Sequence, residues 1–414
     1  MKAALNKIYR MNATCPSCGL LCDDVVIENN NQKIKVLANG CAKGITFFEQ
    51  SLNQDLDKVS AQINGKPATL QQAILQAAKL IKASQQPLFA GLSTDVQGFR
   101  SIYNLSQKTK KTRQSNIQHI NAQSTARNMK VLQSTGWQTT TLTEVKNRAD
   151  VIVCFGDIAK HNPRFFERFI DVDGMFIDAN QRQLIFIGEN CDIKAEISFQ
   201  GTTASLLACR ADDLPEITIA LRALVVGKAL KVTEVAGIKI SDLQTVANKL
   251  KAAKYAVLAW VARDLDYPHA ELTIQNITEI VATLNKSDSN HFGRAAGLPL
   301  GGSDGDTTAN NANAWLSGLA LNDEIVEHDL MIWVNSFSPY KKSPNTENPL
   351  IMLGNINSKF EKISDVFIPI ATPGLDCGGM LFRVDSSVTL PLKKIRENDL
   401  PTLSEVVSEI EKLL

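Results

Sequence analysis

The chain has 414 residues, of which 44% are hydrophobic and 21% are charged, and its formal net charge is +1. This length predicts two or three domains rather than one simple core, and the balanced charge argues against nucleic acid as the main partner. No stretch approaches the roughly 18 apolar residues of a membrane span, and the N-terminal residues lack the apolar core of a signal peptide. We therefore expect a cytoplasmic protein without a membrane partner, in which thiols stay reduced.

Four cysteines near the N-terminus form the strongest motif of the chain. Cys15, Cys18, Cys22 and Cys41 follow the spacing C-x2-C-x3-C-x18-C. Ligation by cysteine alone suits an iron–sulfur cluster or a structural zinc, and the spacing before Cys22 is atypical of a zinc ribbon. The sequence therefore predicts a 4Fe–4S cluster, with zinc as the alternative. A site without metal and a disulfide framework are the other interpretations, and nothing marks the chain as secreted.

Residues 1–50 are expected to form a small β module around these cysteines, followed by α/β domains at 51–228 and 229–414. Apolar spacing and capping residues predict, in chain order, strands over 25–27 and 34–36, helix 69–83, strand 87–93, a helix from 94 to about 110, a helix through 132, strands 151–156 and 184–188, helices 213–226 and 242–250, strand 255–260, a helix through 284, a glycine-rich loop over 291–308, helix 312–321, strands 330–334, 350–353 and 365–370, and helix 403–414. This alternation is typical of doubly wound parallel sheets.

A four-cysteine module ahead of a long α/β body resembles the molybdopterin-dependent oxidoreductases, whose fold is of the formate dehydrogenase/DMSO reductase type. Residues 364–385 resemble the segment of that family in which an apolar strand ends in proline and a small-residue turn leads to an arginine. Residues 143–157 with 161–164, and residues 15–24, resemble more narrowly the B subunit of formylmethanofuran dehydrogenase.

The resemblance implies a 4Fe–4S cluster beside a tungsten or molybdenum bis-pterin centre that interconverts carbon dioxide and formate. An amidohydrolase subunit then couples formate to a furan coenzyme. The family holds its metal by a cysteine or selenocysteine, followed by a histidine, shortly before the segment that matches residues 145–150.

The chain departs from the family at this position. It has no cysteine between Cys41 and Cys154, and the corresponding residues 121–128 offer Ser124 as the one conceivable ligand. A soft thiolate is therefore missing where the metal needs it. We expect the tungsto- or molybdopterin to be lost.

The loss of this ligand makes the chain most similar to the B subunit of the bacterial formyltransferase/hydrolase complex. The resemblance implies partners, which are an amidohydrolase-like A subunit, a C subunit and a formyltransferase subunit, in tetrahydromethanopterin-linked oxidation of formaldehyde to formate. We expect this subunit to be non-catalytic. The alternatives are a catalytic tungsten or molybdenum subunit with an atypical ligand and a separate electron-transfer module, against which the length argues.

Three further positions are candidates with an alternative structural explanation. Arg294, in the glycine-rich loop, is a candidate cofactor-binding residue or part of a solvated loop. The segment 376–379 contacts a pterin phosphate or forms a tight turn. Gly156 and Asp157, at the end of a strand, lie where open α/β sheets bind ligands, or simply end the strand.

Overall fold

The computed structural model describes residues 8–30, 33–50, 60–111, 116–120, 123–189, 203–286, 293–322, 325–358 and 363–414. The chain forms two compact units. The first comprises residues 1–122, 302–383 and 388–414, and the second comprises 123–301 with 384–387. None of the described helices is long and apolar enough to cross a membrane.

These units differ from the division expected from sequence, 1–50, 51–228 and 229–414. The expected boundary at 228 lies inside the second unit, which continues to residue 301. The first unit is interrupted by the second, because strands on either side of the insertion pair in one sheet. Pairing between distant segments is decided by packing, so the local composition of the chain does not reveal where one unit ends and the other begins.

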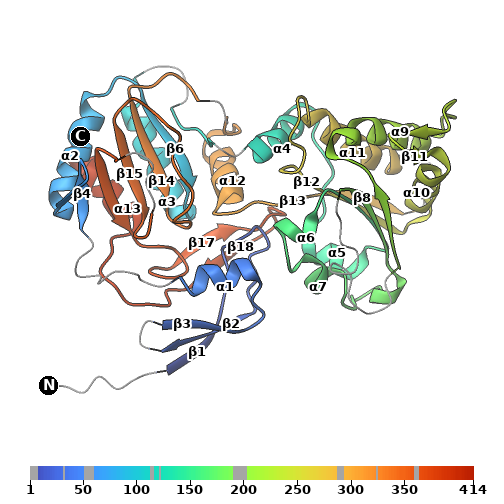
Figure 1. The fold of residues 1–414 in the computed structure, drawn as a ribbon, viewed down its shortest axis with the longest axis horizontal. Coiled ribbons are helices and arrows are strands. Elements are labelled where there is room, and N and C mark those ends of the chain that lie inside the picture. Colours follow the sequence, from blue (N-terminus) through green and yellow to red (C-terminus); the bar gives the residue numbers. More distant parts are fainter. Residues whose placement is uncertain are drawn as a thin grey trace. The chain divides into compact units, whose positions relative to one another are not determined.

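The cysteine-rich module is part of the first unit and has its own antiparallel sheet. Its elements are β1 (Ile8–Ala13), β2 (Val25–Asn30), β3 (Lys33–Ala38) and α1 (Ala42–Phe48). Strands β2 and β3 were expected, whereas β1 was not. β1 pairs with β2 along its whole length, from Ile8 opposite Asn30 to Ala13 opposite Val25, so its partner lies beyond the cysteine loop (Figure 1).

The main sheet of the first unit has the strand order β5-β4-β16-β15-β14-β6. Its strands are β4 (Ala61–Ile63), β5 (Lys66–Ala68), β6 (Pro87–Ser93), β14 (Leu330–Asn335), β15 (Leu350–Asn355) and β16 (Val366–Ile370). The last four pair in parallel, and β4 joins them antiparallel. Each of these four parallel strands is buried along its length, as expected for a sheet with both faces covered.

Four helices bury their apolar sides in one core with alternate residues of this sheet. They are α2 (Leu70–Ala83), α3 (Val96–Thr109), α12 (Asp306–Ser317) and α13 (Leu403–Lys412). The opposite face carries a smaller cluster around Trp333, to which no described helix contributes a buried residue. Thr69 and Gln72 form the capping box of α2, and Asp95 caps α3 as its position predicts.

The second unit contains a five-stranded parallel sheet of order β13-β12-β7-β8-β9. Its strands are β7 (Val151–Phe155), β8 (Gln183–Gly188), β9 (Thr203–Ala208), β12 (Tyr255–Val261) and β13 (Arg294–Leu300). The sequence wrongly suggested a loop at β13, because the strand contains Gly297 and Pro299. Proline is tolerated here because β13 is an edge strand of the sheet.

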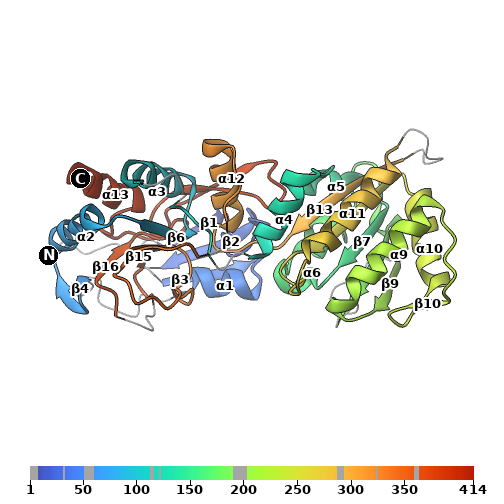
Figure 2. The same ribbon diagram turned by 90° about the horizontal axis from the view of Figure 1, so that it is seen from above.

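Helices cover both faces of this second sheet. The helices α4 (Gln123–Ser134), α9 (Leu214–Val226), α10 (Ile240–Ala252) and α11 (Glu271–Leu284) share one core with it, and α9, α10 and α11 lie side by side (Figure 2). The other face is covered by α5 (Leu142–Arg148), α6 (Ile158–His161) and α7 (Phe165–Phe169). There the ring of Phe166 lies 5.6 Å from that of Phe186 in β8. The doubly wound arrangement is confirmed for this unit.

The remaining elements are short. They are the hairpins β10 (Glu234–Val235) with β11 (Ile238–Lys239) and β17 (Gly379–Phe382) with β18 (Thr389–Leu392), and the 3-10 turns η2 (Ala179–Gln181) and η3 (Ala211–Asp213).

Candidate functional site

The loop between β1 and β2 carries three of the four motif cysteines. The amide of Cys15 donates to the carbonyl of Cys22 at 2.8 Å, which closes the loop, and an inner turn joins the amide of Leu21 to the carbonyl of Cys18. All three cysteines are buried, each 6% exposed. Cys41 lies at the N-cap of α1 and is half-buried.

Two observations connect Cys15 to the segment that carries Cys41. A Cβ atom at Gly44 would lie 3.2 Å from the sulfur of Cys15 and 4.0 Å from that of Cys41, so both sulfurs border the same space. The thiol of Cys15 donates to Ser17 Oγ at 3.3 Å, and the Ser17 hydroxyl donates to the carbonyl of Lys43. The fold therefore brings the ends of the motif together.

The surroundings of Cys15 and Cys18 raise the pKa of both thiols. Burial raises the pKa of Cys15 to about 12 and that of Cys18 to about 11, and neighbouring thiols raise both further. Lys43 acts in the opposite direction on Cys18. A thiolate set in this position needs a positively charged centre to stabilise it, as a bound metal does.

The donor set fits a metal by its chemistry, because four thiols are the ligands that iron–sulfur clusters and structural zinc use. Cys15, Cys18, Cys22 and Cys41 are free thiols, not disulfides. Within the described ranges, no three His, Cys, Asp or Glu side chains are grouped so as to hold a metal ion. The iron–sulfur assignment, with zinc as the alternative, stays a prediction.

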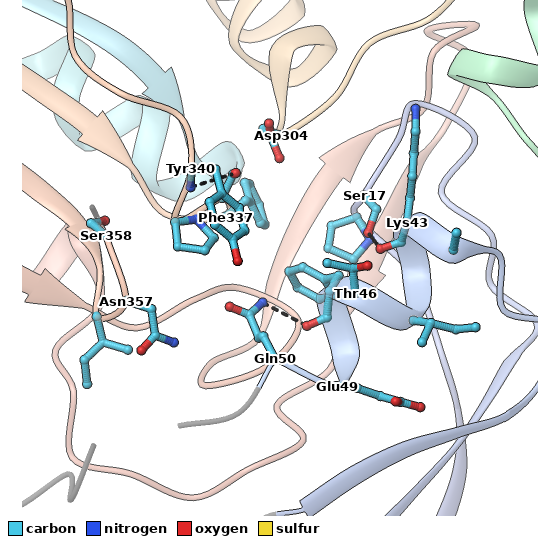
Figure 3. Close-up of a pocket in the computed structure, with 17 residues that line it drawn as sticks. Ser17, Lys43, Thr46, Glu49, Gln50, Asp304, Phe337, Tyr340, Asn357 and Ser358 are labelled. Carbon is cyan, nitrogen blue, oxygen red and sulfur yellow. Dashed lines mark hydrogen bonds between the residues drawn. The ribbon is translucent and has the colours of Figure 1, made fainter. Parts of the chain in front are cut away.

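A cavity of about 950 Å³ adjoins the module inside the first unit (Figure 3). Helix α1 and the loops after β14 and β15 line it; Figure 3 shows Phe337, Tyr340 and Asn357 on one side and Thr46 on the other. The charged residues of this lining are Lys43, Glu49 and Asp304. One cation beside two carboxylates offers a pyrophosphate-bearing ligand little counter-charge.

The second unit places a histidine–aspartate pair at the carboxyl edge of its sheet. The strand order reverses between β7 and β12, the kind of point at which open α/β sheets bind ligands. His161 Nε2 lies 2.7 Å from Asp264 Oδ1, and the amide of Asp157 donates to Asp264 Oδ2 at 2.8 Å. Gly156 has φ +85°, and a Cβ there would lie 2.9 Å from the same carboxylate. The backbone amide of Asp157, which would face a ligand at this edge, is thus already hydrogen-bonded to Asp264.

Asn162 closes the neighbouring part of this edge. Its side chain accepts from the amide of Gly301 at 2.8 Å and donates to the carbonyl of the same residue at 3.4 Å. Gly156 and Asp157 therefore end their strand in a turn that is hydrogen-bonded to Asp264 after β12, and Asn162 after α6 is bonded to Gly301 after β13.

The structure places the other predicted residues as follows. Arg294 is exposed at the amino end of β13, the opposite end of the sheet from the ligand-binding edge, so its position lends no support to the cofactor assignment. Asp376 is buried and bonded to Arg396 and to the amide of Thr372, which agrees with a tight turn. The side chain of Ser124 lies outside the described residues.

Sequence reasoning missed Asp264 as the partner of His161, and it missed Arg396. Both interactions join residues far apart in the chain, 103 positions in the first case and 20 in the second. A polar residue shortly after an apolar strand was the available signal for Asp264.

No family model matches the chain. The B subunit of the tungsten-containing formylmethanofuran dehydrogenase 2 of Methanococcus maripaludis is 24% identical, and the match covers 97% of each chain. The corresponding protein of Methanocaldococcus jannaschii is also 24% identical over 94% of each. The resemblance to the B subunit of formylmethanofuran dehydrogenase is confirmed. The B subunit of the formyltransferase/hydrolase complex Fhc of Methylorubrum extorquens is 31% identical over 99 residues, 24% of this chain and 26% of that protein.

Solved structures share the fold. One chain of the formyltransferase/hydrolase complex (FhcABCD) of Methylorubrum extorquens, crystallised with methylofuran, superimposes with a TM-score of 0.68 at 22% identity, covering 86% of this chain and 98% of that one. Acetylene hydratase of Pelobacter acetylenicus gives 0.60 at 8% identity, with 97% and 69% covered. Together they show a mixed α/β fold with parallel sheets, shared with a chain of the formyltransferase/hydrolase complex and with acetylene hydratase.

Proposed function

We propose that the chain is a non-catalytic B-type subunit of a formyltransferase/hydrolase complex that acts in tetrahydromethanopterin-linked oxidation of formaldehyde to formate. The observation that carries the proposal is the missing thiolate. No cysteine stands between Cys41 and Cys154, where the resemblance to the dehydrogenases implies the tungsten or molybdenum ligand. Without a soft ligand such a metal has no anchor of the usual kind.

Two features of the fold support the loss of the pterin cofactor. The charged lining of the cavity in the first unit is Lys43 with Glu49 and Asp304, which suits a dianionic pyrophosphate poorly. In the second unit, the carboxylate of Asp264 accepts the amide hydrogen bond of Asp157 at the switch point. An anionic ligand at that edge would have to displace a carboxylate already paired with His161.

We propose a mainly structural 4Fe–4S cluster at Cys15, Cys18, Cys22 and Cys41, with zinc as the substitute. Redox chemistry no longer requires the cluster if the pterin is lost, yet all four thiols remain. A module of about 50 residues has little core of its own, and a bound metal can supply the missing stability. In this proposal the whole chain keeps a fold of the molybdopterin oxidoreductase type and serves as a scaffold.

The proposed partners are an amidohydrolase-like A subunit, a C subunit and a formyltransferase subunit, in the cytoplasm. This rests on the similarity to the B subunit of Fhc and to a chain of the FhcABCD structure. In such an assembly the formyl chemistry takes place in the partner subunits.

The alternative is a catalytic tungsten or molybdenum subunit that interconverts carbon dioxide and formate. The similarity over 97% of the chain to a tungsten-containing relative favours it. It requires an atypical ligand such as Ser124, and a hydroxyl binds such a metal poorly unless it is deprotonated.

Metal analysis of the purified native complex tests the two proposals. If the subunit is non-catalytic, the complex should have formyltransferase/hydrolase activity. It should contain less than about 0.1 tungsten or molybdenum per chain and should not oxidise formate with an artificial electron acceptor, because the thiolate ligand is missing. Stoichiometric tungsten or molybdenum together with formate oxidation would overturn it in favour of the catalytic subunit. Isolation of the native protein from its own cells without amidohydrolase and formyltransferase partners would overturn the assignment to the complex.

A further inference from the structure

The second unit holds a cavity of about 690 Å³ at the amino ends of β12 and β13. It is separate from the carboxyl edge of the same sheet, which carries Asp264. It is lined by the segment before α5, by one side of α5 and by the first residues of the two strands. The lining residues of this amino-edge pocket are Thr139, Thr140, Thr141, Glu144, Arg148, Lys254, Tyr255, Gly293 and Arg294. Its volume is within the range of small-molecule sites.

The charged side chains of this amino-edge pocket are mostly cationic. Arg148, Lys254 and Arg294 stand against Glu144, so three positive charges and one negative charge leave a net charge of +2. Arg148 pairs with Glu144 at 2.8 Å and lies over the ring of Phe176 at 4.6 Å, which fixes its guanidinium in place. Among the described residues, the structure shows no ion pair for Lys254 or Arg294.

The backbone that carries Lys254 and Arg294 is held by hydrogen bonds. The carboxylate of Asp150 accepts from the amides of Lys254 and Tyr255 at 2.7 and 2.9 Å. The amide of Arg294 donates to the carbonyl of Lys254 at 2.9 Å. The backbone positions of both unpaired cations are therefore fixed before any ligand arrives, which lowers the entropy cost of binding.

Neutral hydroxyl groups complete the lining. The hydroxyls of Tyr255 and Thr140 lie 2.8 Å apart, and burial raises the pKa of the Tyr255 phenol, which keeps it protonated. Thr139 and Thr141 add two more hydroxyls. Guanidinium, ammonium and hydroxyl donors around one cavity are the groups that recognise phosphate and carboxylate oxygens.

We propose that the amino-edge pocket binds a small molecule that carries at least two negative oxyanion charges, as a phosphate ester or a polycarboxylate does. Lys254 and Arg294 contact the anion directly, and the Arg148–Glu144 pair forms one wall. This site is independent of the four cysteines and of the cavity beside them, and it assigns Arg294 a ligand at the amino edge of the sheet.

Calorimetric titration of the purified full-length chain tests the site, with inorganic pyrophosphate and citrate as probes at low ionic strength. We expect at least one probe to bind with a dissociation constant below about 1 mM. Lys254→Gln and Arg294→Gln should each weaken it about tenfold, the effect of losing one charge-assisted contact. Lys231→Gln is the matched control, since Lys231 is exposed in the same unit and does not line the pocket.

Each result has a defined meaning. Tighter binding of pyrophosphate identifies a phosphate ester as the ligand class, and tighter binding of citrate identifies a polycarboxylate. Lack of binding by both probes, an equal loss in the Lys231→Gln control, or unchanged affinity in Arg294→Gln would overturn the site. Arg294 and Lys254 are exposed, so circular dichroism melting should confirm that both variants fold as the wild type does.

Discussion

Arg396 and Asp376 form an ion pair in which each side chain is only 1% exposed. Arg396 Nε lies 2.5 Å from Asp376 Oδ1, and the guanidinium also donates to the carbonyl of Gln50 at the end of the cysteine module. The neighbouring Ile395 accepts from the side chain of Asn29 in β2 at 2.6 Å. The segment around Arg396 therefore connects the module to the turn after β16, within the first unit.

Breaking this pair should strongly destabilise the first unit. Arg396→Met leaves the carboxylate of Asp376 buried without its counter-ion, and we expect a loss of about 3–5 kcal/mol in the free energy of unfolding. Urea denaturation measures it. The control, Lys412→Met, removes an exposed pair with Glu409 and should cost less than about 1 kcal/mol. Similar costs for the two variants would show that the buried charge of Asp376 does not need Arg396.

Replacing Cys18 should empty the proposed metal site. Loss of one of four thiolates is expected to lower metal affinity by at least about 100-fold, more than the loss of a residue that only supports a ligand. Cys18→Ser should then lose bound iron or zinc by elemental analysis and melt earlier, while formyl hydrolysis by assembled partner subunits persists. Cys209→Ser, in the second unit, is the control and should keep its metal. Wild-type protein with neither metal, or a Cys18→Ser variant of unchanged stability, would defeat the prediction.

Gly156 should be intolerant of any side chain. Gly156→Ala forces a Cβ to within 2.9 Å of Asp264 Oδ2, in addition to the strain of φ +85°. Gly227 is a matched control, with φ +88° and no atom within 4 Å of a Cβ. Gly227→Ala should cost about 1 kcal/mol, and Gly156→Ala about 2 kcal/mol more. Equal costs in urea unfolding would show that the turn relaxes away from Asp264.

Asp329 should make stability depend on acid pH. Burial tends to raise its pKa, but hydrogen bonds from Ser84 and the amides of Gln85 and Gln86 outweigh this and hold the pKa below 3.8. A lowered folded-state pKa gives stability that is present above the unfolded value and is lost as pH falls through the folded value.

Asp329→Asn should therefore cost about 1 kcal/mol at pH 7, a small figure because the group is exposed. The difference from wild type should shrink towards pH 3, in unfolding followed at both pH values. Asp212→Asn, which removes an exposed charge paired with Arg210, should show no such trend. A difference that grows on acidification would contradict the assigned sign.

Local patterns in the sequence were sufficient for most elements. Unbroken apolar runs such as 151–155 and 330–334 are strands, and the Thr69–Gln72 capping box starts α2 where expected. The cysteine spacing placed the motif in one short module, and the resemblance to the B subunit of formylmethanofuran dehydrogenase came from short segments. These features succeed because helix and strand periods, caps and short loops depend on neighbours in the chain.

Tertiary structure decided what depends on distant partners. The first unit resumes at residue 302 after an insertion, β13 is a strand in spite of Gly297 and Pro299, and Arg294 consequently lies at the amino edge of the sheet. The pairing of His161 with Asp264 likewise follows from the adjacency of β7 and β12, and Arg396 is buried because its segment packs against Asp376 and the end of the cysteine module. Strand order is selected by packing between surfaces far apart in sequence, and side chains at a sheet edge meet only after that selection is made.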